Sequence, residues 1–378
     1  MSEFIDRKIT KEIEDNIFKG KIIIIYGPRQ VGKTTLVRAL LSKYGNTDDY
    51  YNCDEPDIRL SLTNKTSTEL RSFFGDKKLI VIDEAQRVEN IGITLKLLID
   101  NYPDIQIIAT GSSSFDLANK INEPLTGRKY EYHLYPFSIE ELNSKYSKLE
   151  LTRFKDENMI FGLYPEVFFS SQNDKIKNLK ILVDSYLYKD ILSFGNIRKP
   201  DMIIKLLQAL ALQVGNQVSY TELANLIGVD KNTIENYIII LEKAFIIFRL
   251  GSFSRNLRNE IKFSKKIYFY DLGVRNALIN NFNPLELRQD TGALWENFLI
   301  SERIKYNSNN FLYVNSYFWR TFTQQEIDYI EESGDKLSAY EFKYSVNKKP
   351  KPLKNFIEAY LKSSFEIING DNYLDFVM

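Results

Sequence analysis

Residues 27–34 combine glycines, a lysine and a threonine at a spacing that suits phosphate binding. They follow the pattern GxxxxGK[ST], with Gly27 and Gly32 as the glycines and Lys33 and Thr34 at the end. The glycines allow backbone N–H groups to curl around phosphate oxygens at the start of a helix, where the helix dipole favours anions. Lys33 adds a positive charge for the β- and γ-phosphates, and the Thr34 hydroxyl can ligate magnesium. The pattern therefore predicts a site for a nucleoside triphosphate with Mg²⁺.

The residues expected to hold the nucleotide form one continuous stretch of the chain. For Arg29 and Gln30 the sequence leaves two orientations open, toward the phosphates or toward solvent. The predicted nucleotide-binding residues of this loop are Gly27, Pro28, Arg29, Gln30, Val31, Gly32, Lys33, Thr34 and Thr35.

Two adjacent acids supply the second half of such a site. Residues 79–82 are all aliphatic and predict a buried strand, which ends at Asp83 and is followed directly by Glu84. We expect Asp83 to hold the magnesium water shell and Glu84 to orient or deprotonate the attacking water. These roles predict hydrolysis of the bound nucleotide, and the absence of a GTP-selective NKxD motif at its usual place favours ATP.

Three further polar residues are candidates for the same site. Residues 104–114 predict a buried strand ending in hydroxyl side chains, so that Thr110 or Ser112 either contacts the γ-phosphate and water or the serines cap the next helix. Arg128 either stabilises transition-state charge, in its own subunit or in a neighbour of a homo-oligomer, or lies on the surface. His133, the single histidine, has no partner histidine for a metal site, and we expect it to be packed or solvated.

Acidic residues near the C-terminus raise a separate chemical question. Glu341 and Lys343 are two residues apart on a predicted strand, which places them on one face. A hairpin can bring Asp328 to the same place, and Glu296 on the preceding helix can add a third carboxylate. Carboxylates grouped in this way bind Mg²⁺ and activate water for phosphodiester cleavage. The sequence leaves open whether such a site is active or serves only as a DNA-end or partner-binding platform.

Several elements must position these side chains. Residues 21–26 predict a β-branched strand buried on both faces of a parallel sheet, and a helix follows the glycine loop. Residues 48–56 are strand-like and are inserted before the strand that ends at Asp83. Toward the C-terminus, residues 315–332 predict one strand that carries Asp328, with a turn at residues 333–336 before the strand of Glu341.

The middle of the chain is mainly helical and predicts a connector followed by a helix-turn-helix. Residues 219–247 contain two helices, with Ser219 or Thr221 capping the first, Gly228 forming the turn and Asp230 capping the second. A basic wing hairpin is expected to follow and either contacts DNA phosphates or serves as an interdomain scaffold. Its five cationic residues are Arg255, Arg258, Lys262, Lys265 and Lys266.

The composition limits the class of protein. The 378 residues favour two or three domains, and the 44% hydrophobic residues can bury a core. No segment offers the roughly 20 apolar residues of a membrane span, the N-terminus lacks a secretory pattern, and Cys53 is the single cysteine. We therefore expect a cytoplasmic protein with no membrane partner. Because 50 basic residues balance 50 acidic ones, any nucleic-acid surface must be a local patch.

Taken together, these motifs resemble a known family of bacterial and archaeal proteins. The segments GPRQVGKTTL, IVIDEAQ, ATGSSS, LTGR, LYPFS, GLYPEVF and SYLYKDIL look like AAA-type P-loop ATPases of the AAA_14 kind. The resemblance implies a C-terminal winged helix and a PD-(D/E)xK nuclease-like domain of the DUF4143 type. It also implies an α/β fold, in which a P-loop NTPase parallel sheet with helices is followed by the winged helix and a restriction-endonuclease-like α/β domain.

The resemblance implies four parts, and the sequence leaves three functional hypotheses open. The parts are an ATPase domain at residues 1–145, a helical connector at 146–200, a winged helix at 201–285 and a nuclease-like domain at 286–378. One hypothesis is an ATPase, with ATP and Mg²⁺, that acts on DNA. The second is a nucleotide-gated binding or regulatory protein, of the defence or toxin-antitoxin type, with an inactive nuclease-like domain. The third is a metal-dependent nuclease with a regulatory ATPase.

Overall fold

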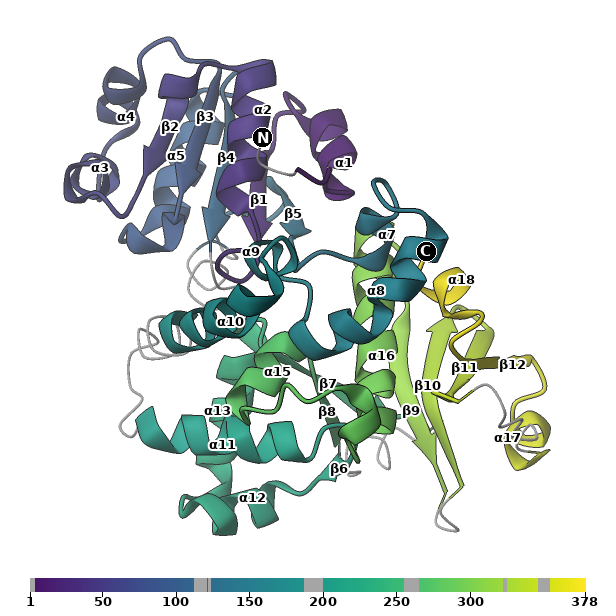
Figure 1. The fold of residues 1–378 in the computed structure, drawn as a ribbon. Helices are drawn as coiled ribbons and strands as arrows, with labels where there is room; N and C mark the ends of the chain where they lie inside the picture. The colour runs from purple at the N-terminus through teal and green to yellow at the C-terminus, as the bar shows by residue number, and fades with distance from the viewer. Residues whose placement is uncertain are drawn as a thin grey trace. The chain divides into compact units, whose positions relative to one another are not determined.

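The structure is a computed structural model that describes residues 4–111, 121, 124–186, 200–254, 265–321, 325–345 and 354–378. The chain divides into two compact units (Figure 1). The N-terminal unit comprises Asp6–Tyr135 and Lys243–Phe245. The C-terminal unit comprises Met1–Ile5, Pro136–Glu242 and Ile246–Met378.

A parallel sheet of five strands forms the centre of the N-terminal unit. The strands are β1 (Ile22–Tyr26), β2 (Tyr50–Asn52), β3 (Leu79–Asp83), β4 (Gln106–Gly111) and β5 (Lys129–His133). Their order across the sheet is β2-β3-β4-β1-β5. Every residue of β1, β3 and β4 is buried, as expected for strands covered on both faces. The predicted buried strands at these places are thereby confirmed.

Helices precede and connect these strands. They are α1 (Ile9–Asn16), α2 (Lys33–Tyr44), α3 (Pro56–Leu62), α4 (Ser67–Phe74) and α5 (Ile91–Asn101), with short 3-10 turns η1 (Thr47–Asp49) and η2 (Ala85–Arg87). Because β4 lies between β1 and β3, the order of the strands in the chain differs from their order across the sheet. Such a switch in strand order is where open parallel sheets bind ligands.

The C-terminal unit begins with helices. They are α7 (Ile139–Leu142), α8 (Lys148–Phe161), α9 (Pro165–Phe168), α10 (Gln172–Tyr186), α11 (Pro200–Leu212), α12 (Tyr220–Ile227) and α13 (Lys231–Lys243). The predicted caps of α12 and α13 are present: Ser219 accepts from the Glu222 N–H, and Asp230 accepts from the Thr233 N–H at 2.9 Å. Gly228 ends α12 in the left-handed region at φ 79°, a conformation that glycine adopts at low cost.

A second sheet of seven strands runs through the rest of this unit. Its strands are β6 (Gln217–Val218), β7 (Ile247–Ser252), β8 (Lys265–Phe269), β9 (Asn315–Arg320), β10 (Glu326–Ser333), β11 (Lys336–Phe342) and β12 (Ser363–Ile368). Their order is β12-β11-β10-β9-β7-β8-β6, and the parallel pair β7 and β9 joins Gly251 to Tyr317. The sheet therefore crosses the expected boundary between residues 201–285 and 286–378, and the four-part division stays a prediction.

One strand prediction is corrected in this sheet. Residues 315–332 form two antiparallel strands, β9 and β10, where the sequence pattern indicated a single strand. The Thr321 N–H donates to the Gln325 carbonyl at 2.9 Å, next to the ends of the two strands. The predicted turn before the strand of Glu341 is confirmed, because β10 and β11 pair from Ser333 opposite Lys336, with Gly334 at φ 58°.

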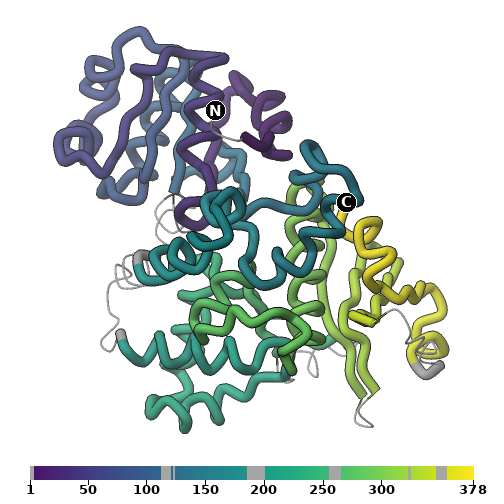
Figure 2. The backbone as a smooth tube through the Cα atoms, in the orientation of Figure 1, coloured from purple at the N-terminus to yellow at the C-terminus, as the bar shows by residue number. Residues whose placement is uncertain are grey.

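The remaining helices of the C-terminal unit support this sheet. They are α15 (Leu272–Leu278), α16 (Thr291–Asn309), α17 (Lys354–Ala359) and α18 (Tyr373–Val377), with the 3-10 turn η4 (Leu285–Leu287). Figure 2 shows α18, at the C-terminus, beside α7 at the start of the same unit, and the two helices are in contact. Among the described residues, no helix has the length and apolarity that crossing a bilayer requires.

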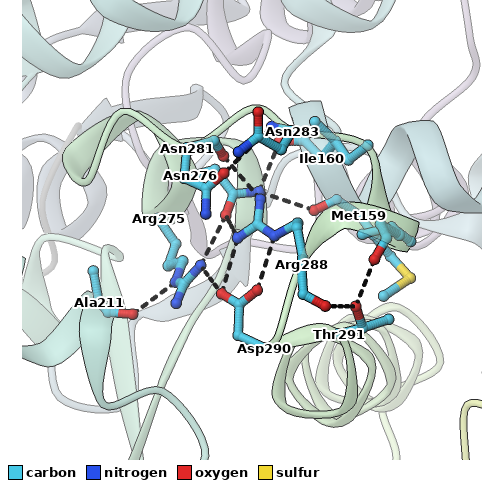
Figure 3. A network of polar contacts seen from close by, with 11 residues as sticks. Met159, Ile160, Ala211, Arg275, Asn276, Asn281, Asn283, Arg288, Asp290 and Thr291 are labelled. Atoms are coloured by element: carbon cyan, nitrogen blue, oxygen red, sulfur yellow. Dashed lines mark hydrogen bonds and ion pairs between the residues drawn. The ribbon is translucent and has the colours of Figure 1, made fainter.

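A buried polar network surrounds the residues at the N-terminus of α16 (Figure 3). Asp290 accepts hydrogen bonds from Arg275 at 2.7 Å and from Arg288 at 2.8 and 2.9 Å. Both arginine side chains are almost completely buried, and Asn276 accepts from each of them at 3.0 Å. Burial raises the pKa of the Asp290 carboxyl, but the two guanidinium groups outweigh burial and lower this pKa to about 2.

Replacing Asp290 with alanine is expected to destabilise the C-terminal unit by about 3 kcal/mol, because two buried guanidinium groups lose their counter-charge. The melting temperature should fall by about 6 to 12 °C. In the wild type, the lowered pKa means that this contribution is present above pH about 4 and is lost as the pH falls toward 2. Calorimetry checks both effects. The exposed pair of Asp375 with Lys148 offers the control, since Asp375→Ala should change the melting temperature little.

Candidate nucleotide site and carboxylate cluster

The glycine loop connects the end of β1 to the start of α2. Gly32 has φ 96°, a left-handed conformation that favours glycine, and it directly precedes the first residue of α2. A side chain at Gly27 would place its Cβ 2.1 Å from the Leu134 carbonyl oxygen, so only glycine fits between the loop and the end of β5. The loop therefore lies close to the sheet and leads directly into the N-terminus of a 12-residue helix, where backbone N–H groups are available to an anion.

Within this loop, the side chains differ in where they lie. The Lys33 ammonium is buried and donates to the carbonyls of Gly27 and Pro28, at 2.8 Å each. Thr34, Thr35 and Gln30 are exposed, and Gln30 has φ 62°. The Lys33 ammonium therefore lies inside the curve of its own loop. Phosphate oxygens bound there can replace the carbonyls of Gly27 and Pro28 as its hydrogen-bond acceptors.

Asp83 lies opposite the loop at the end of β3 and is buried. Its Oδ2 accepts from the Thr34 hydroxyl at 2.9 Å, which joins the two halves of the predicted site. Thr110 in β4 and Tyr50 in β2 also donate their hydroxyls to this carboxylate. Carboxylate and hydroxyl oxygens are ligands suited to Mg²⁺ and its waters, so the pair of Thr34 and Asp83 fits that ion.

Glu84 has an unusual backbone for a residue that is not glycine. Its φ and ψ are 53° and 40°, and its N–H is directed toward the Asp83 carboxylate at 3.2 Å and the Thr110 hydroxyl at 3.3 Å. The Glu84 carboxylate accepts a hydrogen bond from the Gln86 side chain. Left-handed conformations of this kind cost free energy and are concentrated at functional sites. The arrangement holds Glu84 beside the metal candidate Asp83.

Three residues near this site were not identified from the sequence. Arg7 is buried and donates to the Val31 carbonyl of the loop at 2.6 Å, and Gln86 and Tyr50 contact the two acids. The sequence did offer a signal that Tyr50 lies near the site, because Tyr50 belongs to the strand-like insertion, which pairs with the strand of Asp83. For Arg7 the sequence offers none, since the contact spans 24 residues and depends on the tertiary fold.

The other candidates of the N-terminal unit have different outcomes. Arg128 precedes β5 at the amino end of the sheet, beside Ile22, whereas the loop follows the opposite end of β1, about 16 Å away. There it pairs with Asp100 at 2.6 Å, so the placement in its own subunit's site is corrected. His133 packs against the rings of Tyr26 and Tyr135, as expected. Ser112 lies outside the described residues.

The C-terminal unit brings the four other predicted residues into one cluster. Glu341 accepts from the Lys343 ammonium at 2.6 Å, and Asp328 accepts from the Phe342 N–H at 2.8 Å. Burial, together with the nearby carboxylates of Glu296 and Glu341, raises the pKa of Asp328 to about 8. The hairpin of β10 and β11 and the helix α16 therefore meet as the sequence predicted.

Lys266 from β8 enters the same cluster, which the sequence did not indicate. Its ammonium lies 2.9 Å from a Glu296 oxygen and 2.5 Å from a Glu326 oxygen, and its side chain is 3% exposed. Burial alone would lower the pKa of Lys266, but the Glu296 and Glu326 carboxylates outweigh burial and raise it. Lys266 lies in β8, which pairs antiparallel with β7 as the expected wing hairpin requires, but its burial in ion pairs corrects the expectation that it offers a positive charge to DNA phosphates.

The fit of Mg²⁺ to this cluster is poor. Among the residues that the structure describes, no three Asp, Glu, His or Cys side chains are grouped so as to hold a metal ion. The Lys266 ammonium already lies 2.9 Å from one Glu296 oxygen, and the repulsion between two cations at such distances is strong. Of the other expected wing residues, Lys265 is in β8, whereas Arg255, Arg258 and Lys262 lie outside the described residues.

Three family models match successive parts of the chain, and none covers half of it. Residues 19–143 match the family described as AAA domain. Residues 154–285 match a domain of unknown function, DUF8612, and residues 291–376 match another, DUF4143. The N-terminal unit therefore carries a P-loop ATPase-like AAA domain, on which the loop and the two acids lie.

Curated relatives match most of the chain at low identity. The uncharacterized protein MJ1544 of Methanocaldococcus jannaschii is 28% identical over 78% of this chain and 69% of its own length. The uncharacterized protein Rv2008c of Mycobacterium tuberculosis is 27% identical over 84% of this chain and 69% of its own length.

Among solved structures, a signal transduction ATPase with numerous domains, PH0952 of Pyrococcus horikoshii, matches 82% of this chain at 13% identity. This chain covers 48% of that protein, about half its length, with a TM-score of 0.31.

Proposed function

We propose that this chain is an ATP-hydrolysing AAA-type ATPase. The observation that carries the proposal is the meeting of the glycine loop, Asp83 and Glu84 at the carboxyl end of one parallel sheet, joined by the 2.9 Å hydrogen bond from Thr34 to Asp83. ATP bound with Mg²⁺ supplies the γ-phosphate and the cation. Lys33 and the loop N–H groups would hold the phosphates, Thr34 and Asp83 would hold the metal and its water, and Glu84 would orient or deprotonate the attacking water.

The C-terminal unit suggests what the nucleotide controls. The capped pair α12 and α13 supports a helix-turn-helix of the winged type, and the meeting of Glu296, Asp328, Glu341 and Lys343 supports a nuclease-like module. The ATPase proposal therefore includes a coupled DNA-facing part, with DNA as a partner. Assembly of several copies would allow Arg128, with its side chain 40% exposed, to serve a neighbouring site.

A second candidate function is favoured by one specific observation, the Lys266 ammonium within the carboxylate cluster. A cluster that holds its own cation suits a binding platform better than a metal-dependent nuclease. On this alternative, the protein is a nucleotide-gated binding or regulatory protein, in which ATP sets the conformation that a partner recognises.

Turnover measured with and without DNA tests these proposals. We expect the purified chain to release phosphate from ATP with Mg²⁺, and duplex or single-stranded DNA to raise this rate several-fold. A measurable rate that DNA leaves unchanged would favour the gated binding protein. No phosphate release under any of these conditions would contradict the ATPase itself.

A further inference from the structure

The carboxylates of the cluster in the C-terminal unit already accept hydrogen bonds from donors of the protein itself. Each of the three carboxylates predicted as Mg²⁺ ligands has one oxygen in a hydrogen bond. Glu296 accepts from the Lys266 ammonium at 2.9 Å and from the Tyr268 hydroxyl at 2.5 Å. Asp328 accepts from a backbone N–H, and Glu341 accepts from Lys343.

Two of these donors are ammonium groups, and Lys266 is the more deeply buried of the two, with 3% of its side chain exposed against 29% for Lys343. Lys266 bridges acids from two elements, Glu296 on α16 and Glu326 on β10, and its ammonium lies 5.4 Å from the centre of the Phe318 ring. With 3% of its side chain exposed, Lys266 has little solvent to move into. A divalent cation that bound Glu296 would therefore lie within a few ångströms of a buried ammonium, an arrangement with strong repulsion.

The route by which Lys266 reaches the acids is a feature of this fold. Lys266 belongs to β8, which pairs with β7. Strand β7 pairs in parallel with β9, and β9 pairs with β10, the strand that carries Asp328. The residue lies outside the segment 291–376 that contains the other cluster residues. Because β8 and β10 belong to one seven-stranded sheet, the ammonium of Lys266 lies beside acids that are far from it in the sequence.

We propose that Lys266 is the built-in counter-cation of this cluster, and that it takes the place a divalent metal would otherwise occupy between the carboxylates. The cluster then binds no Mg²⁺ or Mn²⁺ and performs no metal-dependent cleavage of phosphodiesters. The nuclease-like module acts as a binding platform. This inference concerns only the C-terminal unit and does not rest on ATP hydrolysis.

The test is a titration of nucleotide-free protein with Mn²⁺, followed by calorimetry and by the melting temperature. Wild type should show no Mn²⁺ site that depends on Glu341. Lys266→Met removes the ammonium and keeps the length of the side chain, so it should gain one site, at least tenfold tighter than any wild-type binding, and should melt higher with Mn²⁺ than without it. Adding Glu341→Gln to this variant should abolish the gain.

Lys265→Met is the matched control, because its side chain points to the opposite face of the same strand and is not in these ion pairs. It should behave as wild type. Binding of Mn²⁺ to wild type that Glu341→Gln removes would overturn the proposal, as would a folded Lys266→Met that gains no site. Should Lys266→Met fail to fold, Lys266→Gln takes its place, and the comparison of wild type with Glu341→Gln still decides the claim.

Discussion

Glu84→Gln is expected to bind ATP with wild-type affinity and to hydrolyse it at least about 100-fold more slowly, as the loss of a general base predicts. The substitution keeps the size of the side chain and its contact with Gln86, but removes the charge that can accept a proton from water. Because Glu84 makes no hydrogen bond to the loop in the described structure, ground-state binding of the phosphates should be preserved. Phosphate release and binding of a fluorescent ATP analogue, measured in parallel, separate the two effects.

Glu89→Gln serves as the control, since Glu89 is exposed just beyond the same turn and should be silent in both assays. Normal turnover by Glu84→Gln would remove Glu84 from the proposed role of base. Loss of ATP binding would instead show that Glu84 supports the phosphates.

Lys33→Ala is expected to lower the affinity for ATP by at least about 100-fold, equivalent to about 3 kcal/mol, and to abolish turnover. The buried ammonium now donates to two loop carbonyls, and it is a cationic donor that the β- and γ-phosphates would accept in their place. Equilibrium binding of the fluorescent analogue with Mg²⁺ measures this change directly.

Lys43→Ala is the matched control for this prediction. Lys43 lies at the other end of the same helix with its side chain 57% exposed, paired with Glu14 and close to the Tyr44 ring. The variant should bind ATP as wild type does. An affinity for ATP that Lys33→Ala leaves within threefold of wild type would place the nucleotide elsewhere.

Much of the nucleotide site could be predicted because its residues are close in sequence. The loop is one continuous stretch, and Asp83 and Glu84 are neighbours at the end of a strand whose buried pattern is strong. The strand order then brings the two segments together. The roles of the individual residues in hydrolysis stay predictions.

The residues that escaped prediction reach their places through distant contacts. Arg7 reaches the loop carbonyl of Val31 across 24 residues, and Lys266 reaches Glu296 across 30. Arg128 shows the opposite case. It was expected near the nucleotide site, but it precedes β5, which runs parallel to β1, and therefore lies at the amino end of the sheet, away from the loop at the carboxyl end. Sequence patterns fix which face a side chain takes, but not which distant element comes to meet it.

The elements of the fold that could be predicted are likewise those that depend on neighbouring residues in the sequence. The helix caps at Ser219 and Asp230 and the turn at Gly334 were predicted because each depends on a few adjacent residues. The reversal between β9 and β10 was missed, since residues 321–325 contain no glycine or proline to signal it. The union of β7 with β9 also depends on tertiary contacts.

A crystal structure with a nonhydrolysable ATP analogue and Mg²⁺ tests the central claim most directly. The account predicts that the β- and γ-phosphates lie within residues 27–34, that the Lys33 ammonium turns from the carbonyls of Gly27 and Pro28 to the phosphates, and that Mg²⁺ lies between Thr34 and Asp83. A structure in which the analogue is bound away from this loop, or in which Asp83 and Glu84 face away from the γ-phosphate, would contradict it.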